Sequence, residues 1–429
     1  MFYFLVVVPV VFKCAGNSTS MWQVCFLAVM CASTGLARAR DLRNVTEPRV
    51  PEACASLQAS GGVDTAAIQK ALDSCARGRV VALSAGTFRS GPLRVPSGVG
   101  LLVDSGATLK AIPDPRLYDR GTGMCGKVVD EGSRGACNPF ILMHLATGSG
   151  LYGRGIIDGQ GGEKLVGTNT TWWDLSRQAQ VEGRYQNNPR LVQVNDCADI
   201  TVHQVTLRDS PYFHLTASNT SGLTVWGVTV RAPAGARNTD AIDPNGSQNV
   251  TIARCDVSVG DDGVAISALR SPARHVSVLD CHFGAGNGLS IGSGTLHGVS
   301  DVLVSGVTLN NTLNGVHIKA SSLNGGVVAR VSYRDLCVLN VGKPVDLDMR
   351  YMNHSGDHEP HFRDISLRRV RVLTPGRLKL HGFSAANQLR VSLSDVHLAR
   401  GSQWSVSYAR ISGSWADDAS GRCGYAGNE

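Results

Sequence analysis

Short apolar runs alternate with clusters of Gly, Asn, Asp and Ser over most of the chain. Runs such as VVALSAG, GVGLLVDSGATLKAI, ADITVHQVTLRDS and SGLTVWGVTVRAP are rich in Val, Ile and Leu and end in turn-forming residues. This pattern predicts many short β-strands. In DTAAIQKALDSC, residues 64–75, apolar residues recur instead at helical spacing after Asp64, a suitable N-cap residue. We expect one short helix there, covering the open end of the hydrophobic core.

The central third of the chain contains an internal repeat. The motifs NTDAID, GDDGVAIS, GNGLSIGS and NGVHIKA align so that Asp240, Asp262, Asn287 and Asn314 take one equivalent position, at intervals of roughly 25 residues. Another strand-like segment precedes each motif. Repeats of variable length around a fixed strand core are typical of parallel β-helix coils, whereas a propeller needs longer, four-stranded blades. The expected fold is all-β, a parallel β-helix (solenoid) with a short N-terminal capping helix.

Composition agrees with this architecture and narrows the choice of partners. The chain has 429 residues, 49 of them glycine, with 17% charged residues, and stacked repeats can extend one domain to this length. A net charge of +7 and a pI of about 8.8 favour an acidic partner. Because the basic residues are scattered, nucleic acid is disfavoured, and an anionic polysaccharide fits better.

Two apolar runs near the N-terminus, residues 2–12 and 25–30, precede the sequence Ala37-Arg38-Ala39. They resemble a signal peptide with its cleavage site, and Met21 is a second candidate start. We expect residues 1–39 to be a targeting segment, 40–429 to be one β-helix domain, and the mature protein to be secreted and extracellular. Neither run approaches the roughly 20 residues of a membrane span, so we expect no membrane association. A non-cleaved anchor is the alternative.

The cysteines fit an oxidising compartment. Cys54 with Cys75 would bracket the predicted helix, and Cys125 with Cys137 would close a Gly-rich loop, so both pairs are expected disulfides. An odd number of cysteines follows residue 39, which leaves at least one unpaired. The others are expected to be buried in strands, and no partner is assigned to Cys423. Sequons such as the one at Asn169 could carry glycans.

The repeat brings acidic residues together. Equivalent positions in neighbouring coils lie about 4.8 Å apart, so Asp240 and Asp262 should form a close pair of carboxylates. Asp261 can join them only if the backbone bends, which the flanking Gly260 and Gly263 permit.

The next motif, NGVHIKA, is expected to add counter-charge. Val316 and Ile318 alternate inward, so His317 and Lys319 should point outward beside the aspartates. Three carboxylates with two potential cations suit inverting glycoside hydrolysis, in which one acid protonates the leaving oxygen and a carboxylate activates water. The cations would bind an acidic sugar.

A structural interpretation of the same residues is the alternative. Isolated Asp and Asn residues are common turn formers, an exposed His or Lys is usually only solvated, and Asp243 can be structural. The stacking of Asp240 on Asp262 favours function, because a turn does not need stacked acids without compensation.

The motifs NTDAIDP, GDDGVAI, GxGLSIGS and xIK resemble those of the polygalacturonase family, glycoside hydrolases that cut galacturonan by inversion on a right-handed parallel β-helix. The resemblance runs from about Cys54 to at least Leu373. The NPFILMH and GIIDGQG stretches resemble the bacterial-type members.

This resemblance implies a role for each site residue. Asp261 would be the general acid, while Asp240 and Asp262 would hold and deprotonate the attacking water. Lys319 would bind the substrate carboxylate, and Asn238 would belong to the cleft wall. No cofactor and no metal are implied.

Two residues depart from the family motifs. Asn287 stands where a histidine is expected to tune the protonation of the acid, and His317 replaces an arginine that grips the galacturonate. Asn cannot titrate, and a neutral imidazole lacks the two-pronged donor geometry of a guanidinium. Activity could therefore be lowered, redirected to another pectic polymer, or lost.

Three functions are compatible with these residues. The first is hydrolysis of α-1,4-galacturonosyl linkages of polygalacturonan or pectin by a secreted monomer. The second is a catalytically degenerate relative that binds pectin or a proteinaceous polygalacturonase inhibitor. The third is cleavage by elimination in a calcium-dependent lyase. Endo or exo action and the choice among galacturonan, rhamnogalacturonan and xylogalacturonan stay open.

Overall fold

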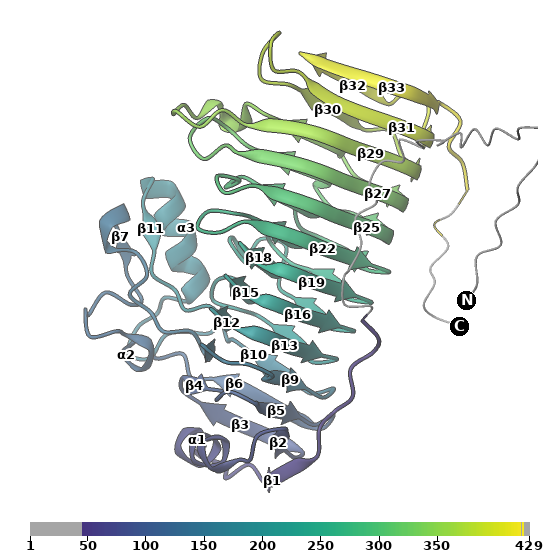
Figure 1. Cartoon of the computed structure of the whole chain (residues 1–429). Helices are drawn as coiled ribbons and strands as arrows, with labels where there is room; N and C mark the ends of the chain where they lie inside the picture. Colours follow the sequence, from purple (N-terminus) through teal and green to yellow (C-terminus); the bar gives the residue numbers. More distant parts are fainter. Residues whose placement is uncertain (1–44, 422, 424–429) are drawn as a thin grey trace, which may run out of the picture. The chain divides into compact units, whose positions relative to one another are not determined.

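The computed structural model describes residues 45–421 and 423, so the expected targeting segment 1–39 lies outside the described residues. The chain winds into a right-handed parallel β-helix, which confirms the predicted fold (Figure 1). The helical elements of the described part are α1 (Thr65–Ser74), α2 (Pro115–Tyr118), α3 (Trp172–Glu182), η1 (Glu131–Ser133) and η2 (Tyr351–Asn353).

Two long sheets run along the β-helix. The smaller one has 11 parallel strands: β4 (Leu93–Arg94), β8 (Ile141–His144), β12 (Val192–Asn195), β15 (Leu215–Ser218), β18 (Ile242–Asn245), β21 (Val264–Ile266), β24 (Leu289–Gly292), β26 (Asn314–Lys319), β28 (Lys343–Asp348), β30 (Arg377–His381) and β32 (Gln403–Ser407).

The larger sheet has 20 strands: β1 (Ala53–Leu57), β2 (Arg79–Leu83), β3 (Gly86–Ser90), β5 (Val99–Val103), β6 (Ala107–Ala111), β9 (Gly150–Tyr152), β10 (Ile156–Asp158), β13 (Ala198–His203), β14 (Thr206–Arg208), β16 (Ser221–Trp226), β17 (Thr229–Arg231), β19 (Gln248–Ala253), β20 (Asp256–Ser258), β22 (Ala273–Leu279), β23 (His282–Phe283), β25 (Val299–Asn310), β27 (Val327–Leu339), β29 (His361–Val372), β31 (Leu389–Leu398) and β33 (Ala409–Ala416). Strand β25 pairs with both β22 and β23, so from there on one long strand replaces two short ones.

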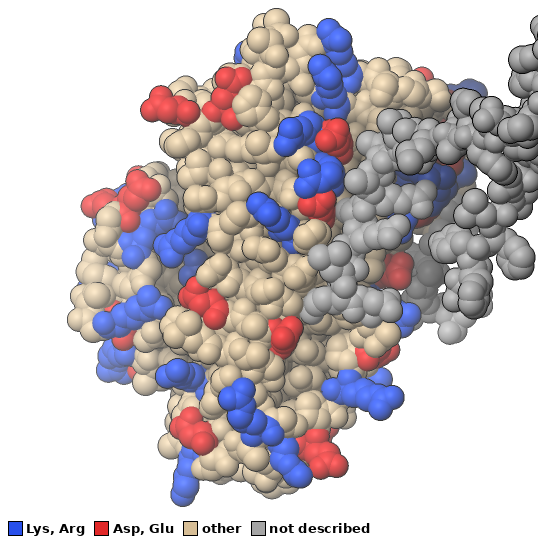
Figure 2. Space-filling model, in the orientation of Figure 1, with Lys and Arg blue, Asp and Glu red and all other residues tan. Residues whose placement is uncertain are grey.

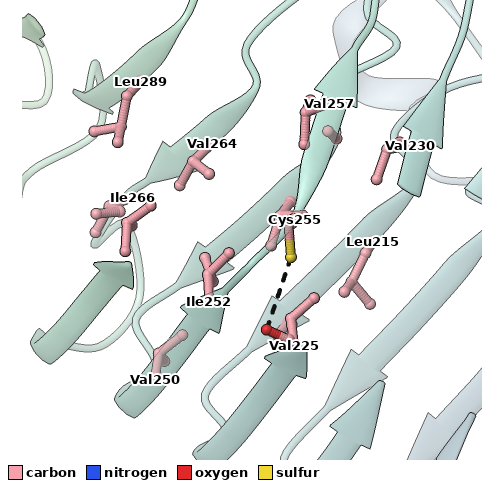
Figure 3. Packing of buried hydrophobic residues seen from close by; sticks show 14 of the residues in the cluster. Leu215, Val225, Val230, Val250, Ile252, Cys255, Val257, Val264, Ile266 and Leu289 are labelled. Atoms are coloured by element: carbon pink, nitrogen blue, oxygen red, sulfur yellow. Dashed lines mark hydrogen bonds between the residues drawn. The ribbon is translucent and has the colours of Figure 1, made fainter. Parts of the chain in front are cut away.

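Stacked apolar side chains form the core between the two sheets. Val225 pairs in register with Ile252, and Ile252 with Val278, so the same inward position repeats from coil to coil. These side chains are fully buried, and Figure 3 shows Ile252 packed among its neighbours, with Leu215 and Val264 of the smaller sheet in the same cluster. Each such side chain contributes roughly 1.5–3 kcal/mol by leaving water. The core fixes the register, and the register fixes which residues line the outside of each coil.

Helix α1 covers the first coil as predicted, with Ile68 and Leu72 buried against the core. Asp64 occupies the N-cap position as expected, but its side chain makes no capping hydrogen bond to the helix. Its carboxylate oxygens accept hydrogen bonds from the backbone N–H groups of Ser60 and Arg89, each at 3.0 Å. Asp64 therefore ties two loops together at the end of the β-helix.

A projection that the sequence did not predict stands out from the N-terminal half of the β-helix. It carries α2, α3 and the antiparallel pair β7 (Val128–Val129) and β11 (Tyr185–Gln186) (Figure 1). Helix α3 begins with a capping box, in which Thr171 and Asp174 satisfy each other's backbone N–H groups.

The two predicted disulfides, Cys54–Cys75 and Cys125–Cys137, are present. A third, Cys337–Cys423, was not predicted and ties the C-terminal segment to β27. Cys197, Cys255 and Cys281 are free and buried as expected, although they lie in the turns between strands and not in the strands themselves. None of the helices in residues 45–421 is long and apolar enough to cross a bilayer.

Candidate active site

The acidic residues converge at the start of three neighbouring strands of the smaller sheet. The first paired residues of β18, β21 and β24 are in register, and Asp240, Asp262 and Asn287 each lie two residues before them. The column inferred from the repeat is therefore present. One oxygen from each of Asp240, Asp261 and Asp262 lies within 4.8 Å of the others.

The two consecutive aspartates both reach the acidic cluster because they lie in a bend before β21, where strand alternation does not apply. Neither Gly260 nor Gly263 has a positive φ angle. The bend therefore does not require glycine for a left-handed backbone conformation. The glycines are needed for space: a Cβ would lie 2.1 Å from the carbonyl oxygen of Ala236 at Gly260, and 2.6 Å from a ring carbon of Phe283 at Gly263.

Asp261 is held by amide donors. The side-chain nitrogen of Asn287 donates to its Oδ1 at 2.9 Å, and that of Asn238 donates to its Oδ2 at 3.3 Å. Asn238 is itself fixed by the side-chain amide of Gln186, on β11 of the projection, at 3.0 Å. Burial, followed by the neighbouring carboxylate of Asp262, raises the pKa of Asp261 above its ordinary value. A carboxyl group in this state suits the donation of a proton.

Asp262 is paired with a buried cation. Nζ of Lys319 lies 2.9 Å from its Oδ2, and the hydroxyl of Ser290 donates to its Oδ1 at 2.8 Å. Burial disfavours the charged ammonium, but the Asp262 carboxylate outweighs this effect and the pKa of Lys319 is raised. The pair places one cation beside the acids, as the sequence predicted.

His317 reaches the same cluster but as a neutral group. Its Nδ1 lies 3.1 Å from the hydroxyl oxygen of Ser290. Because that hydroxyl donates to Asp262, the imidazole is assigned as the donor at Nδ1, which leaves Nε2 unprotonated. Burial and the charge of Lys319, followed by Lys343 and Lys379, lower the pKa of His317 well below its ordinary value. It is therefore not a second positive charge beside the aspartates.

Asp240 and Asp243 are two buried carboxyl groups of the acidic cluster. Burial, followed by the charges of neighbouring aspartates, raises the pKa of both well above the ordinary value. Oδ1 of each is buried and has no hydrogen-bond partner. Asp243, which the sequence suggested was structural, thus belongs electrostatically to the cluster.

A buried histidine, His214, holds the backbone of Asp240 in place. The backbone N–H of Ser210 donates to Nε2 of His214 at 3.3 Å, and Nδ1 of His214 lies 3.1 Å from the carbonyl oxygen of Asp240. Burial lowers the pKa of His214 to about 4, so this ring is neutral and donates through Nδ1.

Several residues of the site were not found from the sequence. Ser290 occupies an outward position of GLSIGS, so strand alternation could have indicated it. Tyr351, whose ring centroid lies 5.6 Å from Nζ of Lys319, begins η2 after β28, in a segment that carries no repeat signal. His214 and Gln186 come from other coils, and only the fold brings them to the aspartates.

The spacing of the three carboxylates would also accommodate a metal ion. However, the ammonium of Lys319 already pairs with Asp262, so the protein itself supplies the compensating positive charge.

Comparison with known proteins places these residues in a wider context. The family model described as "Glycosyl hydrolases family 28" matches residues 117–415. The endo-polygalacturonase of Pectobacterium carotovorum subsp. carotovorum is 42% identical over 375 residues, covering 86% of this chain and 92% of that protein. The polygalacturonase of Ralstonia solanacearum is 34% identical over 433 residues, covering 85% and 82%. The solved polygalacturonase from Erwinia carotovora ssp. carotovora has a TM-score of 0.85 at 40% identity, covering 87% of this chain and 100% of that one.

Proposed function

Because the chain belongs to glycosyl hydrolase family 28, we propose that it hydrolyses the α-1,4 linkages of polygalacturonan, the acidic backbone of pectin, by single displacement with inversion. The observation that carries the proposal is the meeting of Asp240, Asp261 and Asp262, from two successive coils, beside the ammonium of Lys319. An acid, a base and a cation for an anionic sugar are then all available in one cleft.

Asp261 acts in this proposal as the general acid. Its raised pKa keeps a fraction of the carboxyl protonated as the pH rises above the ordinary range for Asp, and the proton passes to the glycosidic oxygen as the C–O bond breaks. Asn287 and Asn238 orient the carboxyl through hydrogen bonds to its two oxygens.

Asp240 and Asp262 hold the attacking water on the opposite side of the sugar. Asp262, whose carboxylate is paired with Lys319, takes the proton as the water attacks the anomeric carbon. Asp240, which lies in the same cluster, orients the water by a hydrogen bond. The hydroxyl of Ser290 holds the Asp262 carboxylate in place by donating a hydrogen bond to it.

Lys319 and His317 contact the sugar on the C-terminal side of the aspartates. The ammonium binds the sugar carboxylate, whereas neutral His317 accepts a hydrogen bond from a hydroxyl group. Asn238 and Asn287 form the cleft wall around Asp261. Because His317 is neutral, we expect the site to bind the acidic sugar more weakly than it would with a guanidinium at this position.

Endo action is part of the proposal, since relatives from two Pectobacterium species are named endo-polygalacturonases.

Action outside the cell is supported by the three disulfides of the described chain, because disulfides persist in oxidising compartments. Lys and Arg are interspersed with Asp and Glu on the face seen in Figure 2. A monomeric state and recognition by an inhibitor protein stay predictions.

The non-catalytic alternative has less support. It was motivated by Asn287 and His317, yet Asn287 keeps a 2.9 Å hydrogen bond to the proposed acid, and a relative 42% identical is named an endo-polygalacturonase.

Incubation of the purified protein with polygalacturonan, rhamnogalacturonan and xylogalacturonan, without added calcium, tests the proposal. We expect new reducing ends and saturated oligogalacturonates of mixed length from polygalacturonan. Unsaturated, ultraviolet-absorbing products would indicate a lyase instead, and the absence of products from all three polymers would contradict hydrolysis.

A further inference from the structure

Arg190 occupies the same column of the β-helix as the aspartates. The strands β12, β15 and β18 are in register, and Arg190 precedes the first paired residue of β12 by two positions, as Asp240 does in β18. Two coils separate the backbones of these residues, a distance of about 10 Å. Arg190 lies on the N-terminal side of the aspartates, whereas Lys319 lies on the C-terminal side.

The guanidinium of Arg190 is held on an aromatic platform, and the carboxyl group of Asp243 acts on it as an attracting charge without a direct contact. Its central carbon lies 5.4 Å from the ring centroid of Phe213 and 5.7 Å from that of Tyr212, and these rings stack with centroids 3.9 Å apart. Nε is buried without a hydrogen-bond partner, and no ion pair among the described residues includes Arg190. Burial lowers the pKa of Arg190, yet a guanidinium stays charged in proteins. A half-buried cation whose Nε lacks an acceptor, and which forms no direct ion pair, is suited to receive an anion from a ligand.

Two further arginines lie near this cation. Arg134, in the loop closed by the Cys125–Cys137 disulfide, and Arg120, just before that loop, both act on Arg190 as repelling charges. Arg134 stacks on the ring of Tyr185 at 4.3 Å, and its ion-pair contact with Glu131, at 4.0 Å between exposed side chains, is long. Nε of Arg120 donates to the neutral amide of Asn138. We call Arg120, Arg134 and Arg190 the arginine cluster.

We infer that the arginine cluster binds a carboxylate of the polygalacturonan chain, on the side of the aspartates opposite Lys319. The inference rests on the proposed function, because polygalacturonan carries a carboxylate on every sugar. A chain lying along the smaller sheet would then meet cations on both sides of the scissile bond. The planar guanidinium of Arg190 suits two-pronged binding of a carboxylate, and its aromatic platform fixes its orientation before the substrate arrives.

Direct binding of oligogalacturonates tests this site. In an Asp261→Asn background, which slows turnover enough for binding to be measured, we compare Arg190→Gln, Arg190→Lys and Arg134→Gln. The control is Arg410→Gln, an exposed arginine on β33 of the larger sheet. Dissociation constants are measured by calorimetry at two salt concentrations, and thermal unfolding reports folding.

We expect Arg190→Gln to weaken binding at least about tenfold and to reduce its salt dependence, with partial recovery in Arg190→Lys. Arg134→Gln, which removes a charge at the protein surface, should weaken binding about threefold even if Arg190→Gln fails to fold. Arg410→Gln should have no effect. In the active enzyme, Arg190→Gln should raise KM and leave kcat within about twofold, which a purely structural role would not do.

Unchanged affinity in both Arg190→Gln and Arg134→Gln would overturn the inference. A wild-type protein that binds oligogalacturonates through these arginines but releases no products would sink the proposed hydrolysis while leaving this binding site in place.

Discussion

The side-chain amide of Asn287 donates a 2.9 Å hydrogen bond to Oδ1 of Asp261, the proposed general acid. The family motif expects a titratable histidine at this position. Asparagine preserves the hydrogen bond and the orientation of the carboxyl group, but it cannot change charge with pH. The site therefore keeps the geometry of its acid and lacks one means of tuning it.

Restoring both motif residues should raise turnover. The double variant Asn287→His, His317→Arg places a titratable donor at Asp261 and a guanidinium at a position in register with Asp346, whose buried Oδ1 lacks a partner. We expect kcat/KM on polygalacturonan to rise several-fold, measured by release of reducing ends. The single variants separate the two effects: Asn287→His should change the pH profile, and His317→Arg should lower KM. A loss of activity in both would mean that the cleft is adapted to a different ligand.

Replacing Asp243 by its amide should stabilise the fold. The pKa of Asp243 is raised above the ordinary value of 3.8, so the folded state favours the protonated form. That stabilisation is complete below about pH 3.8 and is lost as the pH rises through the folded pKa. At pH 7 the buried group destabilises the protein, and Asp243→Asn should add at least about 1 kcal/mol of unfolding free energy.

Guanidinium denaturation at pH 7 and pH 4 checks this effect. The gain from Asp243→Asn should shrink at pH 4. Asp357→Asn, which changes an exposed carboxyl in the loop between β28 and β29, serves as the control with little change. A gain that is equal at both pH values would show that the titration of Asp243 is not the cause.

The stereochemistry of the product tests the assignment of two aspartates to one water molecule. One oxygen from each of the three carboxyl groups lies within 4.8 Å of the others, closer than the roughly 6.5–9.5 Å between carboxyl groups in most inverting glycosidases. Because Asp240 and Asp262 act together on the water in this account, we still expect inversion. Proton NMR of early products should show the β-anomer first, and initial release of the α-anomer would indicate a covalent intermediate instead.

Much of the fold could be predicted because the repeat determines it. The alignment of NTDAID with GDDGVAIS predicted the register of β18 and β21, and with it the meeting of Asp240 and Asp262. The Cys337–Cys423 disulfide could not be predicted, since it joins residues 86 apart and depends on how the last segment folds back. Helix α3 lies in an insertion outside the repeat, so the repeat gave no indication of it.

The neutral state of His317 illustrates what the motif alone could not provide. Two of the charges that lower its pKa, on Lys343 and Lys379, come from later coils with no counterpart in the aligned motifs. Similarly, the support of Asp240 by His214 depends on a backbone carbonyl of the next coil. Sequence spacing indicated which residues meet, whereas their protonation depends on burial and on charges that only the assembled coils define.

Release of reducing ends from polygalacturonan by the wild-type protein and by Asp261→Asn tests the central claim most directly. Asn keeps the shape of the side chain and removes the proton that the mechanism transfers. The account predicts measurable hydrolysis by the wild type, and a fall in kcat of at least about a hundredfold in the variant, with unchanged thermal unfolding and similar binding of oligogalacturonates. Equal activity of the two proteins would contradict the role of Asp261.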